Sequence, residues 1–276
     1  MFNSVNTNVG AMIALQNLNA TNAELNLVQN RVNTGKKVAT AKDNGAIWAI
    51  AQGQRAELGA LNAVSQSLAR GVAAVDVALA AGESVSDLLL QMKEKALAAT
   101  DASLSSAARA ALDEDFGALR DQITQVTENA VFNGVNLLET GAAGFEALAN
   151  ADGTSMMTVE AEVMALGSTN VTVTTTMAIA SATAATAALS AVTASIANVS
   201  GALARMGTQS KALGAHVTFV SKLMDALEAG VGNLVDADLA KESARLQALQ
   251  TKQQLGVQAL GIANQAPQIL NSLFGR

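Results

Sequence analysis

Few residues in this sequence of 276 are of the types that carry out catalysis. The sequence contains one histidine, His216, and no cysteine, which excludes a His-Glu-x-x-His zinc site and thiol chemistry. His216 stands beside the apolar Val217, a setting in which a histidine is usually structural or solvated. The acidic run from Asp113 to Asp115 lies in the first half of an expected helix, where the helix dipole favours negative charge. We therefore predict that the chain is not an enzyme and uses no metal or cofactor.

Phosphate binding and nucleic-acid binding are not indicated either. The dipeptide Gly35-Lys36 lacks the upstream glycine and the following Ser or Thr of a phosphate-binding loop. The net charge is −6 and no dense basic block occurs, whereas nucleic-acid surfaces are strongly basic. We expect no nucleic-acid partner.

The hydrophobic residues indicate a helical architecture. They make up 50 % of the sequence, whereas aromatic residues make up only 3 %. From residue 189 to residue 234, apolar residues recur at alternating steps of three and four with one polar exception, which predicts a long helix that packs against other helices. Its positions are Leu189, Val192, Ile196, Val199, Leu203, Met206, Ser210, Leu213, Val217, Val220, Met224, Leu227, Val231 and Leu234.

Three more helices are predicted before this one, from apolar spacing and from capping residues at their ends. Their limits are after Asn3 or Ser4 to Thr34-Gly35, after Asp43 to about Ala99, and after Ser105 or Ser106 to Phe132-Asn133-Gly134. The first of these helices is rich in Asn, a poor helix former, so we expect it to be ordered only by contact with a partner.

The composition changes between about residues 131 and 184. Two segments with a period of two, 158–164 and 171–179, flank the turn at Gly167-Ser168 and predict a β-hairpin. The β-branched run from Thr172 to Thr176 favours a strand over a helix. The predicted fold class is therefore mainly α: an elongated antiparallel helical bundle or coiled coil with a small β-hairpin region between the third and fourth helices.

The apolar register slips by one residue after Leu234. The next stripe begins at Leu239, eight residues beyond Val231, and such a slip marks a hinge or a domain boundary. This stripe comprises Leu239, Leu246, Leu249, Leu260, Ala263 and Leu270. The last segment is rich in Gln, in parallel with the Asn-rich first helix, so both ends of the chain are expected to need partners.

The sequence predicts neither a cleavable secretory signal nor membrane insertion. The first charged residue is Glu24, so the basic segment that opens a signal peptide is missing. The most apolar stretches, such as Val72 to Ala81, fall short of the roughly 18 consecutive apolar residues of a membrane span.

Three segments in the same order resemble the signatures of bacterial flagellins, and the resemblance covers about residues 1–140 and 190–276. The first runs from Val32-Asn33-Thr34-Gly35-Lys36-Lys37-Val38 through Ala41-Lys42-Asp43-Asn44-Gly45-Ala46 to Ala49-Ile50-Ala51. The second is Val131-Phe132-Asn133-Gly134-Val135-Asn136-Leu137-Leu138. The third extends from Leu234-Val235-Asp236-Ala237-Asp238-Leu239-Ala240-Lys241-Glu242 to Ala263-Asn264-Gln265-Ala266-Pro267-Gln268-Ile269-Leu270.

This resemblance implies a structural subunit that polymerises into the extracellular bacterial flagellar filament used for motility. On the implied mapping, residues 1–34 and 235–276 form a terminal coiled-coil domain that lines an inner tube, and 35–44 form a linker. Residues 45–130 and 185–234 form a helical rod domain, and 131–184 form its β-containing outer part. The residues expected to serve assembly are Leu18, Leu25, Val32, Leu239, Leu246, Leu249, Leu260 and Leu270. We expect the terminal helices to fold as they assemble, because each exposes a stripe without a partner in the monomer.

The implied partners are further copies of the chain, other flagellins, the filament cap and junction proteins, an export chaperone and the flagellar type III export apparatus. Two alternative functions stay open at this point. A hook–filament junction protein shares the terminal pattern, and a soluble coiled-coil adaptor would remain a small oligomer where a flagellin forms tubes.

Two surface features follow from the same resemblance. Flagellins sensed by the animal Toll-like receptor present an Arg, a Leu and a Glu on the rod, where this sequence has Gln91, Lys95 and Asp115, so we expect weak activation of that receptor. O-glycosylation is found on many flagellins, and plain strand and helix composition is an equally weighted explanation of the hydroxyl-rich segment here. The candidate acceptors are Thr172, Thr174, Thr175 and Thr176. We expect Trp48 to pack at a subunit or rod interface rather than to stack on a ligand.

Overall fold

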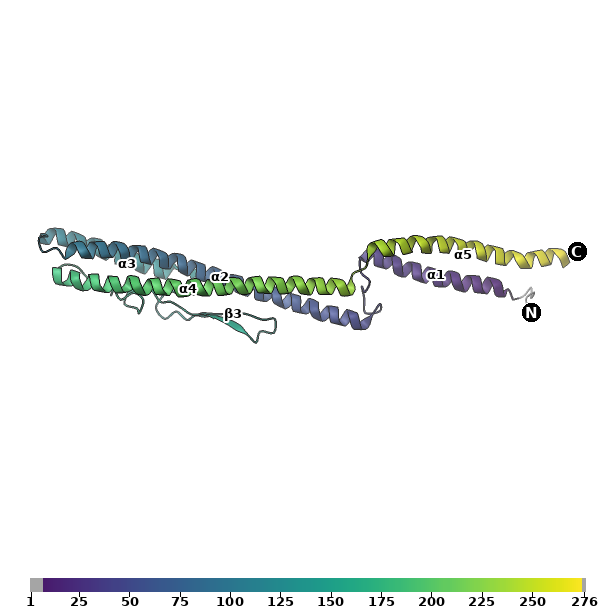
Figure 1. Ribbon diagram of the computed structural model, residues 1–276, viewed down its shortest axis with the longest axis horizontal. Coiled ribbons are helices and arrows are strands. Elements are labelled where there is room, and N and C mark those ends of the chain that lie inside the picture. Colours follow the sequence, from purple (N-terminus) through teal and green to yellow (C-terminus); the bar gives the residue numbers. More distant parts are fainter. Residues whose placement is uncertain (1–6, 275–276) are drawn as a thin grey trace. The chain divides into compact units, whose positions relative to one another are not determined.

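The computed structural model describes the backbone of residues 7–274 and the side chains of residues 7–265. The described residues form five helices and two antiparallel strand pairs, which confirms the mainly α fold class (Figure 1). The helices are α1 (Val9–Thr34), α2 (Gly45–Ala99), α3 (Ser106–Asn129), α4 (Ala182–Val235) and α5 (Leu239–Phe274). The strand pairs are β1 (Val131–Phe132) with β2 (Val135–Asn136), and β3 (Phe145–Leu148) with β4 (Met156–Val159).

The chain divides into two compact units. One comprises Met1–Ala56 and Ala226–Arg276, and the other comprises Glu57–Asp225. The first unit holds α1, α5 and the adjoining ends of α2 and α4. The second holds α3, both strand pairs and the rest of α2 and α4.

Capping side chains define the helix starts with small departures from prediction. α1 begins at Val9, where Asn8 accepts a hydrogen bond from the Ala11 N–H at 3.0 Å; the predicted caps Asn3 and Ser4 lie outside the described residues. Asn44, rather than the predicted Asp43, caps α2 by accepting from the Ile47 N–H at 3.1 Å. The cap of α3 is Ser105, as predicted.

The helix ends follow the same logic. Gly35 ends α1 at φ 68°, a left-handed conformation that glycine adopts without strain, as the sequence predicts. α3 ends at Asn129, before the predicted Phe132-Asn133-Gly134. Asn133 and Gly134 have positive φ instead and form the turn between β1 and β2, a role typical of Asn-Gly.

The long apolar seam of α4 consists of two sets of residues, each with a spacing of seven, and one of these sets is confirmed as buried. Val192, Val199, Met206, Leu213 and Val220, spaced by seven residues, are at most 1 % exposed. The second buried row consists of Ala188, Ser195 and Ala202, each 0 % exposed, whereas the larger residues that follow them in sequence lie at the margin. Small side chains in the seam let neighbouring helices approach closely. At Gly82 of α2, for example, an added Cβ would lie 2.8 Å from Leu203.

Among the described residues, α4 is also the one helix long and apolar enough to cross a membrane by length and composition. Its most apolar window has a mean hydropathy of 1.5 and is 28 % buried inside the protein. The core helices of many soluble proteins have the same composition, so this property is weak evidence for a membrane span.

The predicted hairpin of segments 158–164 and 171–179 is wrong. The observed hairpin pairs β3 with β4 in the register Phe145 with Val159 and Leu148 with Met156, so only Thr158 and Val159 of the predicted segments belong to it. Segment 171–179 contains no strand. Its alternating burial is real, since Val171 and Val173 are fully buried, but its partner is a helix.

The contacts of Thr172 explain why this segment is not a strand. Its N–H donates to Ser195 Oγ at 2.9 Å and its hydroxyl donates to the Ala191 carbonyl at 2.9 Å, so α4 satisfies polar groups that a neighbouring strand would otherwise bind. Further along, Asp113 of α3 accepts from the Ile179 N–H at 2.5 Å. The period of two therefore indicated correctly that Val171 and Val173 are buried, but the segment turns at Thr175-Thr176 and packs on a helix.

Candidate assembly surface

The two terminal helices pair with each other within one chain, and they lie side by side in Figure 1. Leu25 and Val28 of α1 and Leu249 of α5 are buried together, and Val32 and Leu246 pack against them. Four residues predicted to serve assembly therefore already have partners in the single chain. The expectation that this stripe is unpartnered in the monomer is wrong, because the Leu-rich faces of α1 and α5 bury each other.

Polar side chains set how α1 and α5 align. Gln253 donates an amide hydrogen bond to Asn22 at 2.7 Å, and Asn8 donates to the Ala263 carbonyl at 2.7 Å. Arg31 donates to Glu242 at 3.2 Å. The Asn-rich and Gln-rich compositions of the two ends are thus partly explained by pairing between the helices, because amide–amide bonds form only in a particular register.

Outside the Leu25–Leu249 core, this helix pair carries many large apolar side chains in contact with solvent. The exposed ones are Val9, Met12, Ile13, Leu15 and Leu27 on α1, and Leu239, Leu255, Val257 and Ile262 on α5, with exposures from 38 % to 70 %. We call these nine residues the outer apolar set. Such a density of exposed apolar side chains marks an interaction surface. The three- and four-residue spacing of Val9, Met12 and Ile13 was the sequence signal that could have identified it.

The other predicted assembly residues differ in their settings. Leu239 is 49 % exposed and belongs to the outer apolar set. Leu18 and Leu260 are half-buried on α1 and α5. The side chain of Leu270 lies outside the described residues.

Two hollows accompany the exposed side chains. One of about 450 Å³ lies between α1 and α5, where small residues such as Gly10, Ala14 and Gly256 leave space and where Ile13 and Leu255 of the outer apolar set also line it. A second of about 620 Å³ lies on the outer side of α1 beside Val9, Met12, Ile13, Leu15, Gln16 and Asn19. Both are wide enough to receive side chains from another helix.

Backbone hydrogen bonds connect the segment that follows α1 with the segment that precedes α5. The N–H groups of Lys37 and Val38 donate to the Val235 carbonyl at 2.7 and 3.2 Å, and the Ala237 N–H donates to the Gly35 carbonyl at 2.9 Å. Val38 and Val235 are both nearly fully buried at this junction. The helix is interrupted where the apolar register slips, since α4 ends at Val235 and α5 starts at Leu239.

The residues singled out for chemistry have structural roles in the second unit. His216 of α4 donates a ring N–H to the Ala149 carbonyl at 2.7 Å and so fastens the end of β3. Arg205 forms two 2.6 Å hydrogen bonds to the buried Glu162, and this carboxylate raises the pKa of Arg205 above its ordinary value. No cluster of three metal-ligating side chains occurs within the described part of the chain.

The positions aligned with the receptor contact lie on the surface of α2 and α3. Lys95 and Asp115, which the sequence leaves unconnected, form a 2.6 Å ion pair across the two helices, with side chains 37 % and 56 % exposed. Gln91 is exposed nearby on α2. Receptor recognition would therefore have to compete with an internal ion pair.

The four candidate glycosylation residues differ in access. Thr174, Thr175 and Thr176 are exposed. The hydroxyl of Thr172 is engaged with α4, as described above, so it is a poor acceptor in the folded chain.

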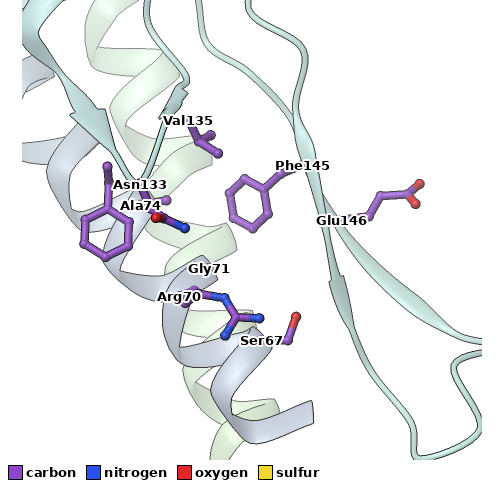
Figure 2. Close-up of a pocket in the computed structure, with 9 residues that line it drawn as sticks. Ser67, Arg70, Gly71, Ala74, Asn133, Val135, Phe145 and Glu146 are labelled. Carbon is purple, nitrogen blue, oxygen red and sulfur yellow. The ribbon is translucent and has the colours of Figure 1, made fainter. Parts of the chain in front are cut away.

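A small pocket of about 160 Å³ lies between α2 and the two hairpins (Figure 2). Figure 2 shows the ring of Phe145 standing over α2 at Gly71, with Ser67 and Arg70 on the same helix. A Cβ at Gly71 would lie 3.0 Å from that ring, so glycine allows the ring to rest on the helix backbone. The pocket is smaller than typical ligand cavities, and we regard it as a packing feature of the hairpin.

Comparisons with known proteins agree with the terminal motifs. The family described as the bacterial flagellin N-terminal helical region matches residues 5–143, and the bacterial flagellin C-terminal helical region matches residues 189–274. The chain is 56 % identical to the flagellin FljM of Caulobacter vibrioides over 99 % of this chain and 98 % of that protein. It is 34 % identical to a flagellin of Brucella melitensis over 98 % and 99 % of the two chains.

Solved structures support the fold. A protein from Vibrio parahaemolyticus, provisionally assigned as a flagellar hook-associated protein, matches with a TM-score of 0.59 at 16 % identity, over 70 % of this chain and 100 % of that chain. At this identity the likeness concerns the fold alone. The matched family regions and the full-length relatives confirm the resemblance seen in the sequence: the chain belongs to the bacterial flagellin family and is a structural subunit of the extracellular flagellar filament.

Proposed function

We propose that this flagellin polymerises by burying the outer apolar set of its α1–α5 pair against neighbouring copies. The observation that carries the proposal is the exposure of nine large apolar side chains on two helices that have already used their Leu-rich faces to pair with each other. Burial of this surface in a filament would remove it from water, which is the main driving force for association. The Leu residues of the inner faces then serve assembly indirectly, by forming the pair that presents the outer faces.

The domain division that accompanies this proposal follows the family mapping. Residues 1–34 and 235–276 line the inner tube, 35–44 link them to the rod, 45–130 and 185–234 form the rod, and 131–184 its outer part. The hydrogen bonds between Val235 and the segment 37–38 support a joint at this boundary. Export would proceed through the flagellar type III apparatus with a chaperone, and the filament cap, junction proteins and other flagellins would be the remaining partners.

Folding of the terminal helices is completed on assembly in this proposal. Only Thr21, Leu25 and Val28 of the 26 residues of α1 are buried in the single chain. So small a core offsets little of the backbone ordering cost of about 1–2 kcal/mol per residue. We expect residues 1–34 and 235–276 to be cut rapidly by protease in the monomer and to be protected in the filament. An equally resistant monomer would contradict this.

The decisive experiment changes Ile13, which is 55 % exposed in the outer apolar set. Ile13→Asp should abolish seeded polymerisation, because a carboxylate without a partner would have to leave water, whereas Ile13→Leu should polymerise normally because its volume and polarity are conserved. Sedimentation and negative-stain electron microscopy measure the filaments, and circular dichroism confirms that the monomer is unchanged. Normal filaments from Ile13→Asp would refute the proposed surface.

A further inference from the structure

The outer apolar set includes one side chain with reactive chemistry, the thioether of Met12. It is 63 % exposed on α1 and lines the hollow of about 620 Å³ beside Val9 and Ile13. The chain contains no cysteine, so an oxidant that attacks soft sulfur meets only methionine. Reactivity toward such oxidants follows exposure of the sulfur.

The methionines of the described residues differ sharply in exposure. Met92, Met164 and Met206 are fully buried in the second unit. Met12 and Met156 are the exposed ones, at 63 % and 46 %, and Met156 lies on β4 away from the terminal helices. Among the residues whose side chains are described, one exposed methionine therefore lies on the proposed assembly surface and the other serves as a natural control outside it.

We propose that Met12 is a modification site at which peroxide-class oxidants control whether a subunit can join the filament. The inference rests on the proposed function, because it requires the outer apolar set to be buried on assembly. The thioether sulfur attacks one peroxide oxygen, a sulfur–oxygen bond forms as the O–O bond breaks, and water leaves. Sulfur is oxidised by two electrons to the sulfoxide while the peroxide is reduced. A thiol-dependent sulfoxide reductase reverses the change by oxidising two thiols to a disulfide and releasing the oxygen as water.

The position of Met12 determines what the sulfoxide does. In the monomer the sulfoxide oxygen stays hydrated beside the exposed Gln16 and Asn19, so the fold is unchanged. In the filament the same oxygen would be pressed against apolar side chains, and a buried polar group without a hydrogen bond is costly. We expect the critical concentration for polymerisation to rise at least about tenfold, from the low end of that cost.

The test oxidises purified monomer with hydrogen peroxide and measures sulfoxide at each methionine by peptide mass spectrometry. Seeded polymerisation of the same samples gives the critical concentration. Oxidation should raise the critical concentration of the wild-type chain at least about tenfold. The critical concentration of Met12→Leu should not change on oxidation, whereas that of Met156→Leu should rise as it does for wild type. Treatment with sulfoxide reductase and thiol should restore polymerisation of the oxidised wild-type chain. In preformed filaments, Met12 should oxidise more slowly than Met156.

Two results with oxidised protein would overturn the inference. One is wild-type chain that is fully sulfoxidised at Met12 and polymerises at the unmodified critical concentration. The other is Met12→Leu that loses polymerisation on oxidation as wild type does. The variant Met12→Gln supplies a polar side chain without oxidant and should be impaired as made; if it polymerises normally, the inference also fails. Ile13→Asp separates the two proposals. If this variant fails to polymerise while the oxidised wild-type chain polymerises, only the role of Met12 is refuted. If Ile13→Asp polymerises, the assembly surface itself is refuted.

Discussion

Two leucines on α5 differ in how far the terminal helix pair buries them. Leu249 is 5 % exposed and packs on Leu25 and Val28, whereas Leu255, six residues later on the same helix, is 60 % exposed. Changing each to alanine removes the same atoms from the same helix. The structure predicts different consequences, because only Leu249 is buried before assembly.

Leu249→Ala should destabilise the pair itself. Core Leu→Ala changes cost about 2–5 kcal/mol, and the lower half of this range applies here because the half-buried Val32 and Leu246 can move into the space. About 2–3 kcal/mol corresponds to a critical concentration about 30- to 150-fold higher. In the monomer, where the pair is only partly ordered, amide hydrogen exchange of peptides from α1 and α5 should rise above the wild-type rate toward that of an unfolded chain.

Leu255→Ala should leave monomer exchange at the wild-type rate. Full burial of a leucine contributes about 1.5–3 kcal/mol, and the exposed 60 % of this side chain represents about 1–2 kcal/mol available only on assembly. The critical concentration should therefore rise about 5- to 30-fold. Hydrogen exchange with mass spectrometry and sedimentation of seeded filaments measure both effects. Faster monomer exchange in Leu255→Ala, or unchanged exchange in Leu249→Ala, would refute the assignment of Leu249 to the core of the pair and of Leu255 to the assembly surface.

Three further predictions concern the rest of the chain. Gly71→Val should lower the stability of the second unit by about 1–3 kcal/mol in thermal unfolding, because its side chain must displace the Phe145 ring 3.0 Å away. Gly59→Val on the same helix is the matched control and should not destabilise, because nothing lies within 4 Å of an added Cβ there. The pKa of Asp43 lies below its ordinary value of 3.8, because the Thr40 N–H donates a hydrogen bond to its carboxylate. The 39–43 turn therefore has this stabilisation above pH 3.8 and loses it as the pH falls through the pKa that Asp43 has in the folded chain. The amide NMR shifts of Ala39 and Thr40 between about pH 5 and 2 would follow that titration, and a midpoint at or above 3.8 would contradict it. Toll-like receptor activation in reporter cells should be weak, since Gln91, Lys95 and Asp115 replace the residues expected there and two of them are paired; a strong signal would count against this mapping.

Local signals in the sequence were sufficient for the helices and for the family. Ser105 and Gly35 cap helices as their residue types predict, since a serine hydroxyl or a glycine with positive φ satisfies the end of a helix without help from distant residues. The register slip after Leu234 identified the break between α4 and α5. These features depend on neighbours within one or two helical turns.

Features that depend on which segment of the chain packs against which could not be predicted from local signals. The β-branched run at Thr172 has the pattern of a strand, but its polar groups bind Ser195 and Ala191 of α4. The strand that does form, β3, begins at Phe145, which the period-two pattern missed. An alternating pattern records that one side of a segment is buried, and the same burial can be supplied by a strand or by a helix.

The terminal helices show the same division most clearly. The sequence by itself determined that both ends are amphipathic helices that need partners, because their apolar spacing and their Asn- and Gln-rich composition are local properties. Only the tertiary structure decided which apolar residues are buried within the chain, at Leu25 and Leu249, and which remain exposed to solvent, at Ile13 and Leu255. The physical reason is that a helix has more than one apolar row, and the row that is buried depends on where the second helix lies.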